Sequence, residues 1–315
     1  MPKAAPIFRY RIRNWREYNQ ALINRGRLTV WFDEQAIRAW RNMEPGHGPE
    51  APRIYSDFAI DCALIFKAVY HLSLRAAQGF LSSVVELWKL TLPIPDYSTV
   101  SRRQGPLQVR LPVGSGSSPR QVVIDATGLK VYGAGEWHVW KHRVGRRRAW
   151  RKLHLGVDEA TKEIVAVDLT ESRVHDSQRV SSLLEQIPDP IGQVSGDGAY
   201  DPRACYKAVL QRGATPTFIP RRTAQRRETK DATGWRAARN RLLQQIEEQG
   251  RSRWRVLSGC TRQSMAENTM FRFKTLFGGR LWARNLERQH PETRVKCAVL
   301  NRRTQLGMAE AMRIR

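Results

Sequence analysis

The order of apolar segments between residues 121 and 220 constrains the fold of this chain more than any other feature. Three strand-like segments come first, and a helix, a strand, a helix and a strand follow them. Strands and helices in this order pack as a mixed sheet with helices on its faces. The sequence therefore predicts an α/β fold with a mixed five-stranded sheet, with strands in 121–133, in the hairpin 150–177, in 191–201 and in 214–220, and with helices in 177–187 and 202–213.

A helical region precedes the predicted sheet. Residues 55–103 carry apolar residues at helical spacing, and Ser56 is placed to cap the first helix. The stretch TLPIPD ends the second helix, and a third, short helix begins at YST and ends at two arginines. Together the last two helices have the outline of a helix-turn-helix. Packing of helices between domains would give the same pattern, so the sequence leaves both interpretations open.

The third helix carries the side chains that a helix-turn-helix would use on DNA. In that interpretation Ser98 and Thr99 reach base edges or phosphates. Arg102 and Arg103, at the end of the helix, contact phosphates.

The balance of charge indicates a polyanionic partner. The 315 residues include 54 Lys and Arg against 29 Asp and Glu, which gives a formal net charge of +25 spread along the chain. A basic, mostly helical insert at about 221–256 adds Arg226, Arg227 and Arg236 as candidate DNA contacts. A protein that is merely basic remains the alternative.

Cysteine usage and hydropathy narrow the class of protein further. The four cysteines form no C-x-x-C pair, so neither a zinc ribbon nor a disulfide framework is expected. The most apolar stretch, FAIDCALIFKAVY, is interrupted by Asp61 and Lys67 and is too short to cross a membrane. No secretory signal is recognisable, and we expect a soluble cytoplasmic protein without membrane contacts.

Three acids stand where the predicted fold can bring them together. Asp125 lies in the first strand, Asp197 ends the fourth strand, and Glu267 lies on a later helix. Each alone has a simpler explanation, such as a turn or a helix cap. In this strand order, however, the first and fourth strands can be neighbours and a late helix can cross their ends. Three close carboxylates need cations to stay ionised, and oxygen ligands suit Mg²⁺, with Mn²⁺ as a substitute.

The helix that carries Glu267 has an apolar face. Met270, Phe273 and Phe277 recur at helical spacing, and Ser264 is placed to cap the helix. Lys274 follows seven residues after Glu267 and therefore shares its side of the helix. A solvated lysine on a basic helix is the simpler interpretation of Lys274.

Several stretches resemble the bacterial insertion-sequence DDE transposases with an RNase H-like core. The resemblance covers RNWREYNQALINRG, VVIDATGLKVYGAGEW, SGDGAYD and the block from SMAENTMFRFK to NRRTQLGM, residues 264–308. It implies an RNase H-like catalytic domain in which Asp125, Asp197 and Glu267 hold two Mg²⁺ ions and Lys274 supports the substrate. The chain departs from the family pattern before this glutamate, because Cys260 and Gln263 occupy the usual Tyr and Arg positions, with Arg262 one residue early.

Other residues carry weaker signals. The pair His175 and Asp176 resembles a family feature, although Asp176 can equally cap the following helix. Tyr200 either stacks on a base or packs internally, and His138 and His142 are better explained by structure than by metal binding.

The resemblance implies a DNA transposase that binds the terminal inverted repeats of its element, cuts the strand ends and joins them to target DNA, as a homodimer on double-stranded DNA. It implies a nucleoid-associated protein of the bacterial cytoplasm. Two alternatives stay open: an RNase H-like nuclease without strand transfer, and a non-catalytic DNA-binding regulator. We expect an aromatic and basic segment in 1–50, a helical DNA-binding region and linker in 51–118, and the catalytic domain in 119–315.

Overall fold

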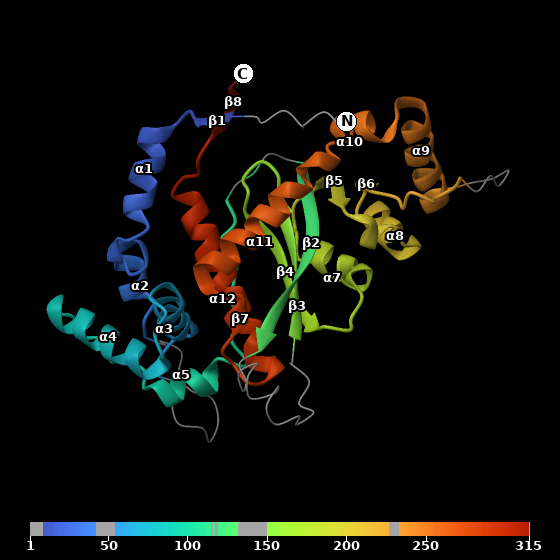
Figure 1. Ribbon diagram of the computed structural model, residues 1–315. Helices are drawn as coiled ribbons and strands as arrows, with labels where there is room; N and C mark the ends of the chain where they lie inside the picture. The colour runs from blue at the N-terminus through green and yellow to red at the C-terminus, as the bar shows by residue number, and fades with distance from the viewer. Residues whose placement is uncertain are drawn as a thin grey trace, which may run out of the picture.

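The computed structural model describes residues 9–41, 54–114, 116, 119–131, 150–226 and 233–314 (Figure 1). Its centre is a sheet with the strand order β4-β3-β2-β5-β6, and a short sixth strand, β7, pairs with β2. The five predicted strands are confirmed in the predicted order, and β7 was not predicted. The strands are β2 (Arg120–Val131), β3 (Trp150–Asp158), β4 (Ile164–Glu171), β5 (Ile191–Gly196), β6 (Thr215–Phe218) and β7 (Arg280–Leu281).

The sheet is mixed, as the sequence predicts. Strands β2, β3 and β4 form an antiparallel meander, whereas β5 and β6 run parallel to β2. Asp158 shapes the β3–β4 turn, because its Oδ1 accepts hydrogen bonds from the backbone N–H groups of Ala160 and Thr161. The first and fourth strands, β2 and β5, are therefore direct neighbours, which was the arrangement that the predicted acid site required.

Helices cover both faces of the sheet because side chains alternate along β2. Val122 and Ile124 pack with the helices of one face, whereas Val123 belongs to the core on the other face. The first face is covered by α7 (Val180–Glu185) and α8 (Arg203–Gln211), and the second by α11 (Gln263–Phe277) and α12 (Leu286–Gln305). Figure 1 shows α11 running across the sheet over β2.

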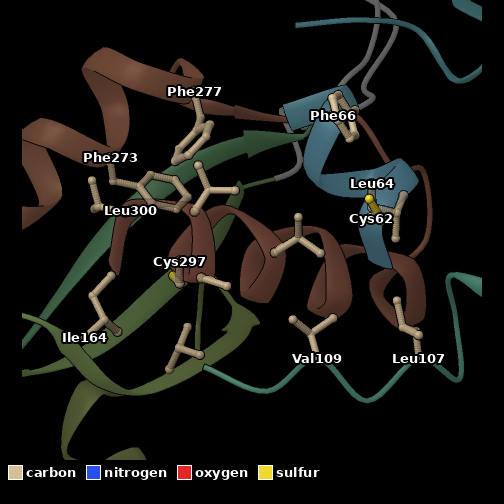
Figure 2. Packing of buried hydrophobic residues seen from close by; sticks show 14 of the residues in the cluster. Cys62, Leu64, Phe66, Leu107, Val109, Ile164, Phe273, Phe277, Cys297 and Leu300 are labelled. Atoms are coloured by element: carbon tan, nitrogen blue, oxygen red, sulfur yellow. The ribbon is translucent and has the colours of Figure 1, made fainter. Parts of the chain in front are cut away.

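The N-terminal helices share the core of the second face. Side chains from α3, from the stretch around Leu107 and Val109, and from β4, α11 and α12 meet in one cluster (Figure 2). Ser56 caps α3 through the N–H of Ala59, as predicted. The helices are α1 (Trp15–Asn24), α2 (Glu34–Arg38), α3 (Asp57–Val69), α4 (Leu74–Leu87) and α5 (Tyr97–Arg103), with a 3-10 turn η1 (Leu28–Val30). The helical region thus shares a core with the central sheet.

A second, two-stranded sheet joins distant parts of the chain. Strand β1 (Arg9–Ile12) pairs antiparallel with β8 (Ala311–Ile314), so that Arg9 lies opposite Ile314. Beside the ribbon, the Asn14 side chain donates to the carbonyl of Met308 and accepts from the N–H of Glu310. The sequence did not predict this ribbon.

The basic insert is helical, as predicted, with α9 (Gly234–Gln249) and α10 (Arg251–Leu257). A 3-10 turn η4 (Cys260–Arg262) then leads directly into α11. The prediction that Ser264 caps α11 is wrong, because the helix has already begun at Gln263 and Arg262 occupies the N-cap position without a capping side-chain bond.

All four cysteines are free and buried, which agrees with the absence of a disulfide framework. Within the described ranges, no helix is long and apolar enough to cross a membrane.

Candidate active site

Asp125 and Asp197 lie on neighbouring strands at the same level. In the parallel β2–β5 pair Val123 lies opposite Ser195, so each acid follows two residues after this pair. Asp197 ends β5 and caps the 3-10 turn η3 (Gly198–Tyr200), since its Oδ1 accepts from the N–H of Ala199 at 2.9 Å. The helix-cap role considered from the sequence is therefore present, and it leaves the second carboxylate oxygen of Asp197 available.

Glu267 lies on α11, which packs on β2 and β3. The helix α11 packs on β2 and β3 through its buried residues Met270, Phe273 and Phe277. Alternation along β2 directs Asp125 to the same face as Val123, which is the face that α11 covers. Glu267 is exposed on the helix.

Asp125 lies in an environment that disfavours its negative charge. The pKa of the Asp125 carboxyl is raised to about 6, mainly by burial, and the negative charges of Asp197, Glu267 and Asp176 act in the same direction. The hydrogen bond from the N–H of Ala126 to Asp125 Oδ1, at 2.8 Å, acts in the opposite direction. A half-buried carboxylate near like charges is an arrangement that a bound cation would stabilise.

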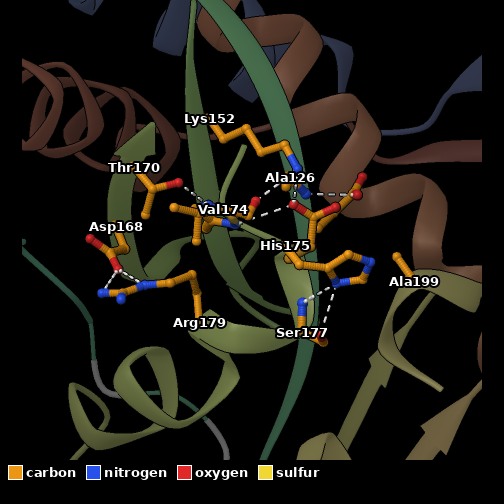
Figure 3. A network of polar contacts seen from close by, with 12 residues as sticks. Ala126, Lys152, Asp168, Thr170, Val174, His175, Ser177, Arg179 and Ala199 are labelled. Atoms are coloured by element: carbon orange, nitrogen blue, oxygen red, sulfur yellow. Dashed lines mark hydrogen bonds and ion pairs between the residues drawn. The ribbon is translucent and has the colours of Figure 1, made fainter. Parts of the chain in front are cut away.

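Asp176 is a fourth acid of this cluster. Its Oδ1 is 2.9 Å from Lys152 Nζ on β3, and the same ammonium group donates to the carbonyl of Val174 (Figure 3). The prediction that Asp176 caps the following turn η2 (Asp176–Arg179) is wrong, because the cap is His175, whose Nδ1 accepts from the N–H of Ser177. From the sequence, a family feature and a helix cap at Asp176 were equally good interpretations of this pair, and the structure assigns the cap to His175.

A buried histidine and a buried tyrosine lie beneath the acids. His154 is fully buried and bonds Thr170 Oγ1 through Nε2 at 2.8 Å, and burial lowers its pKa to about 4. Tyr200 packs internally, at 1% exposure, against Phe218, so the alternative of stacking on a base is wrong. Burial raises the pKa of Tyr200, and so do the charges of Asp125, Asp176 and Asp197.

Gly196 makes room for this tyrosine. A Cβ at Gly196 would lie 2.7 Å from Cδ2 of the Tyr200 ring. This distance is too short for a carbon–carbon contact, so only glycine, which has no Cβ, fits here. The glycine in SGDGAYD thus lets the ring pack directly under the end of β5.

Two family models, each described as a transposase DDE domain, match this chain over residues 23–134 and 116–302. The chain belongs to the DDE transposases. The mixed sheet of the structure agrees with the RNase H-like fold expected for such a transposase. The family acts on DNA and uses divalent metal ions, and the match extends over the helical region as well as the sheet.

The two residues of this transposase that depart from the family pattern, Cys260 and Gln263, are buried in the interior. Cys260 is buried and its thiol donates to the carbonyl of Thr217, with 3.3 Å between sulfur and oxygen. Gln263 is also buried, and Arg262 forms an ion pair with Glu159. Lys274 is exposed, seven residues along α11 from Glu267. The substitutions therefore fill the interior and leave the four acids in place.

The proposed helix-turn-helix of the transposase departs from the usual geometry. Residues 88–96 separate α4 from α5, a connection longer than the usual three or four residues. Ser98 and Arg102 are exposed, and Arg102 donates to Thr99 Oγ1. Arg103 instead donates to the carbonyl of Tyr55 and pairs with Asp57 at 2.6 Å, which holds α5 against the start of α3.

The candidate residues of the insert have different surroundings. Arg226 pairs with Glu247 at 3.0 Å, and Arg236 lies with its guanidinium 5.4 Å from the centre of the Trp235 ring. Arg227, together with His138 and His142, lies outside the described residues.

The carboxylates of the candidate site are suitable ligands for a metal ion, but in this structure they lie too far apart to share one. Carboxylate oxygens are the donors that hard divalent cations prefer. Among the described residues, however, no three His, Cys, Asp or Glu side chains are grouped closely enough to hold an ion. Sharing one ion therefore requires the carboxylates to approach one another more closely than they do here.

Proposed function

We propose that this DDE transposase binds the terminal inverted repeats of an insertion sequence and catalyses strand cleavage and strand transfer to target DNA with Mg²⁺, for which Mn²⁺ substitutes. The observation that carries the proposal is geometric: Asp125 and Asp197 lie at the same level on the neighbouring strands β2 and β5, and α11, which bears Glu267, packs on β2. In a chain with a net charge of +25, such a cluster is suited to phosphodiester chemistry.

Asp125, Asp197 and Glu267 would hold the ions, and Lys274 would hold a phosphate beside them. Bound in pairs, divalent ions activate the attacking oxygen and stabilise the leaving oxygen of a phosphodiester. The protein orients the strand and stabilises charge through groups fixed by the fold, with Asp125 held by the N–H of Ala126.

Binding of DNA ends would involve several surfaces. We assign residues 1–50, 51–118 and 119–315 to an aromatic and basic segment, a DNA-binding helical region and the catalytic domain. Ser98, Thr99 and Arg102 are the candidate contacts of α5, and the insert adds Arg226, Arg227 and Arg236. Joining two element ends in one complex requires two active sites, so we propose a homodimer on DNA.

A nuclease without strand transfer and a non-catalytic regulator are the competing functions. Purified protein is incubated with DNA carrying the element ends, a target plasmid and Mg²⁺, and products are mapped at nucleotide resolution. Ends joined to the plasmid support a transposase. Cleaved but unjoined ends indicate a nuclease, and binding without cleavage indicates a regulator.

We expect Ca²⁺ to support binding of DNA ends but not cleavage. Ca²⁺ is larger and less strict in geometry than Mg²⁺, so it neutralises the acids without placing two ions at the spacing that the chemistry needs. The measurement compares gel-shift and cleavage assays in the two ions. Full turnover in Ca²⁺ alone would argue against a two-metal site.

Replacing Ser98 and Thr99 by Ala should reduce discrimination between element ends and scrambled DNA. We expect a loss of roughly tenfold, because base contacts are worth about 1–3 kcal/mol each. Affinity is measured on both DNAs by salt titration. The control is the double change of Ser82 and Ser83 to Ala, which removes exposed hydroxyls from α4. An unchanged ratio in the Ser98 and Thr99 variant would make α5 a packing helix.

A further inference from the structure

An open groove lies between α8 and the start of α9, and none of the four acids lines it. Its volume is about 570 Å³. Three basic side chains line it together with one tryptophan: Arg203 and Lys207 from α8, and Trp235 and Arg236 from α9. Of the described residues that line the groove, none carries a carboxylate.

The part of the chain that the structure describes supplies no counter-charge to the three cations of this groove. Among the described residues, Arg203, Lys207 and Arg236 form no ion pair. Neighbouring arginines of the same region are paired, since Arg239 binds Asp201 and Arg226 binds Glu247. Like charges gathered without a partner repel one another, and an anionic ligand would remove that repulsion.

Trp235 arranges two of the cations. The guanidinium carbons of Arg203 and Arg236 each lie 5.4 Å from a ring centre of Trp235. Trp235 itself packs against the core between the sheet and α8, so its ring is held in place. Two oriented guanidinium groups beside a lysine match the oxygens of phosphate better than a single flexible cation does.

The groove starts next to the catalytic turn. Asp197 caps η3, and α8 begins at Arg203 six residues later. Arg203, Lys207 and Gln211 are all exposed and four residues apart, so they form one stripe about 12 Å long that leads away from Asp197. Asp201 fixes the far wall, since it accepts two hydrogen bonds from Arg239 of α9, both at 2.9 Å.

We propose that this groove binds the phosphodiester backbone of the DNA that leaves the active site. The inference rests on the proposed function, and it adds Arg203, Lys207 and Trp235 to the surfaces that contact DNA. The strand in the groove belongs either to the donor DNA flanking the element end or to the target DNA, and both present the same phosphate chemistry.

The test replaces Arg203 and Lys207 together by Gln. The control replaces Arg302 and Lys162 by Gln, which removes the same two charges from the end of α12 and from the β3–β4 turn, both outside the groove. Binding is measured against salt on an element end without flank, an element end with flank, and random target DNA. Each lost phosphate contact should lower the slope of log affinity against log salt by about 0.9.

If the double variant has a slope of log affinity against log salt that is lower by about 1.8 than that of the control on one of the DNAs, the groove binds phosphates of that DNA. Loss on the flanked end alone indicates donor DNA, and loss on the random DNA indicates target. Equal slopes for variant and control on all three DNAs overturn the inference. Mapping of phosphates whose ethylation blocks binding gives a second readout, in which Trp235→Ala should lose the same phosphates as the double variant.

The experiments distinguish an error in the groove proposal from an error in the proposed transposase function. If the wild-type protein cleaves element ends while the groove variant binds as the control does, only the groove is wrong. If the wild-type protein binds ends with the predicted groove contacts but never cleaves, the groove stands and the transposase activity is wrong.

Discussion

Glu267→Gln should reduce cleavage of element ends by at least about a thousandfold while leaving their binding nearly unchanged. The amide keeps the size of the side chain but loses the negative charge that a divalent cation needs. Glu267 is exposed and none of its neighbours depends on it for packing, so the fold should persist. Cleavage is followed in Mg²⁺ with end DNA, and binding is measured by gel shift.

The matched control is Glu185→Gln, the same change at an exposed position on α7. This variant should cleave as the wild type does. Wild-type cleavage by Glu267→Gln would remove Glu267 from the catalytic group. Asp125→Asn and Asp197→Asn should behave like Glu267→Gln, and combining them should cost little more, because the acids act as one unit.

Phe273→Ala should lower the free energy of unfolding by about 3–5 kcal/mol. Phe273 is fully buried, its ring centre lies 5.2 Å from that of Phe277, and it anchors α11 in the core shared with the helical region. The loss comes from apolar contacts and from the cavity left behind. Equilibrium denaturation in urea, followed by circular dichroism, measures it.

Phe271→Ala is the control for this prediction, since Phe271 lies on the same helix but is 69% exposed. Its effect should stay within about 0.5 kcal/mol. Similar losses for the two variants would mean that α11 does not pack through the Phe273 face. The helix would then be unable to hold Glu267 beside Asp125.

Periodicity was enough to predict the central sheet and the acids on it. Strands such as 121–131 alternate two apolar faces, and that pattern depends only on neighbours in sequence. The adjacency of β2 and β5 followed from the order of strands and helices. The register of β2 and β5, which the sequence does not predict, then places Asp125 and Asp197 at one level.

Features that depend on contacts between residues far apart in the sequence could not be predicted. Strand β7 has two residues, Arg280 and Leu281, too few to show any period. Asp176 joins the acids through Lys152, which lies 24 residues away on another strand. Tyr200 is buried only because Gly196 and Phe218 leave a space for its ring, and no local pattern encodes that space.

The β1–β8 ribbon has a consequence for the order of folding. Closing a loop between Arg9 and Ile314 in an unfolded chain costs about 5 kcal/mol of entropy, more than a ribbon of four residue pairs returns. Once α1 and α12 are packed in the folded protein, the segments that form β1 and β8 are already near each other. Most of the entropy of loop closure has then been lost before the ribbon forms. We therefore expect the β1–β8 ribbon to form last in folding, on molecules whose interior has already reached its native packing.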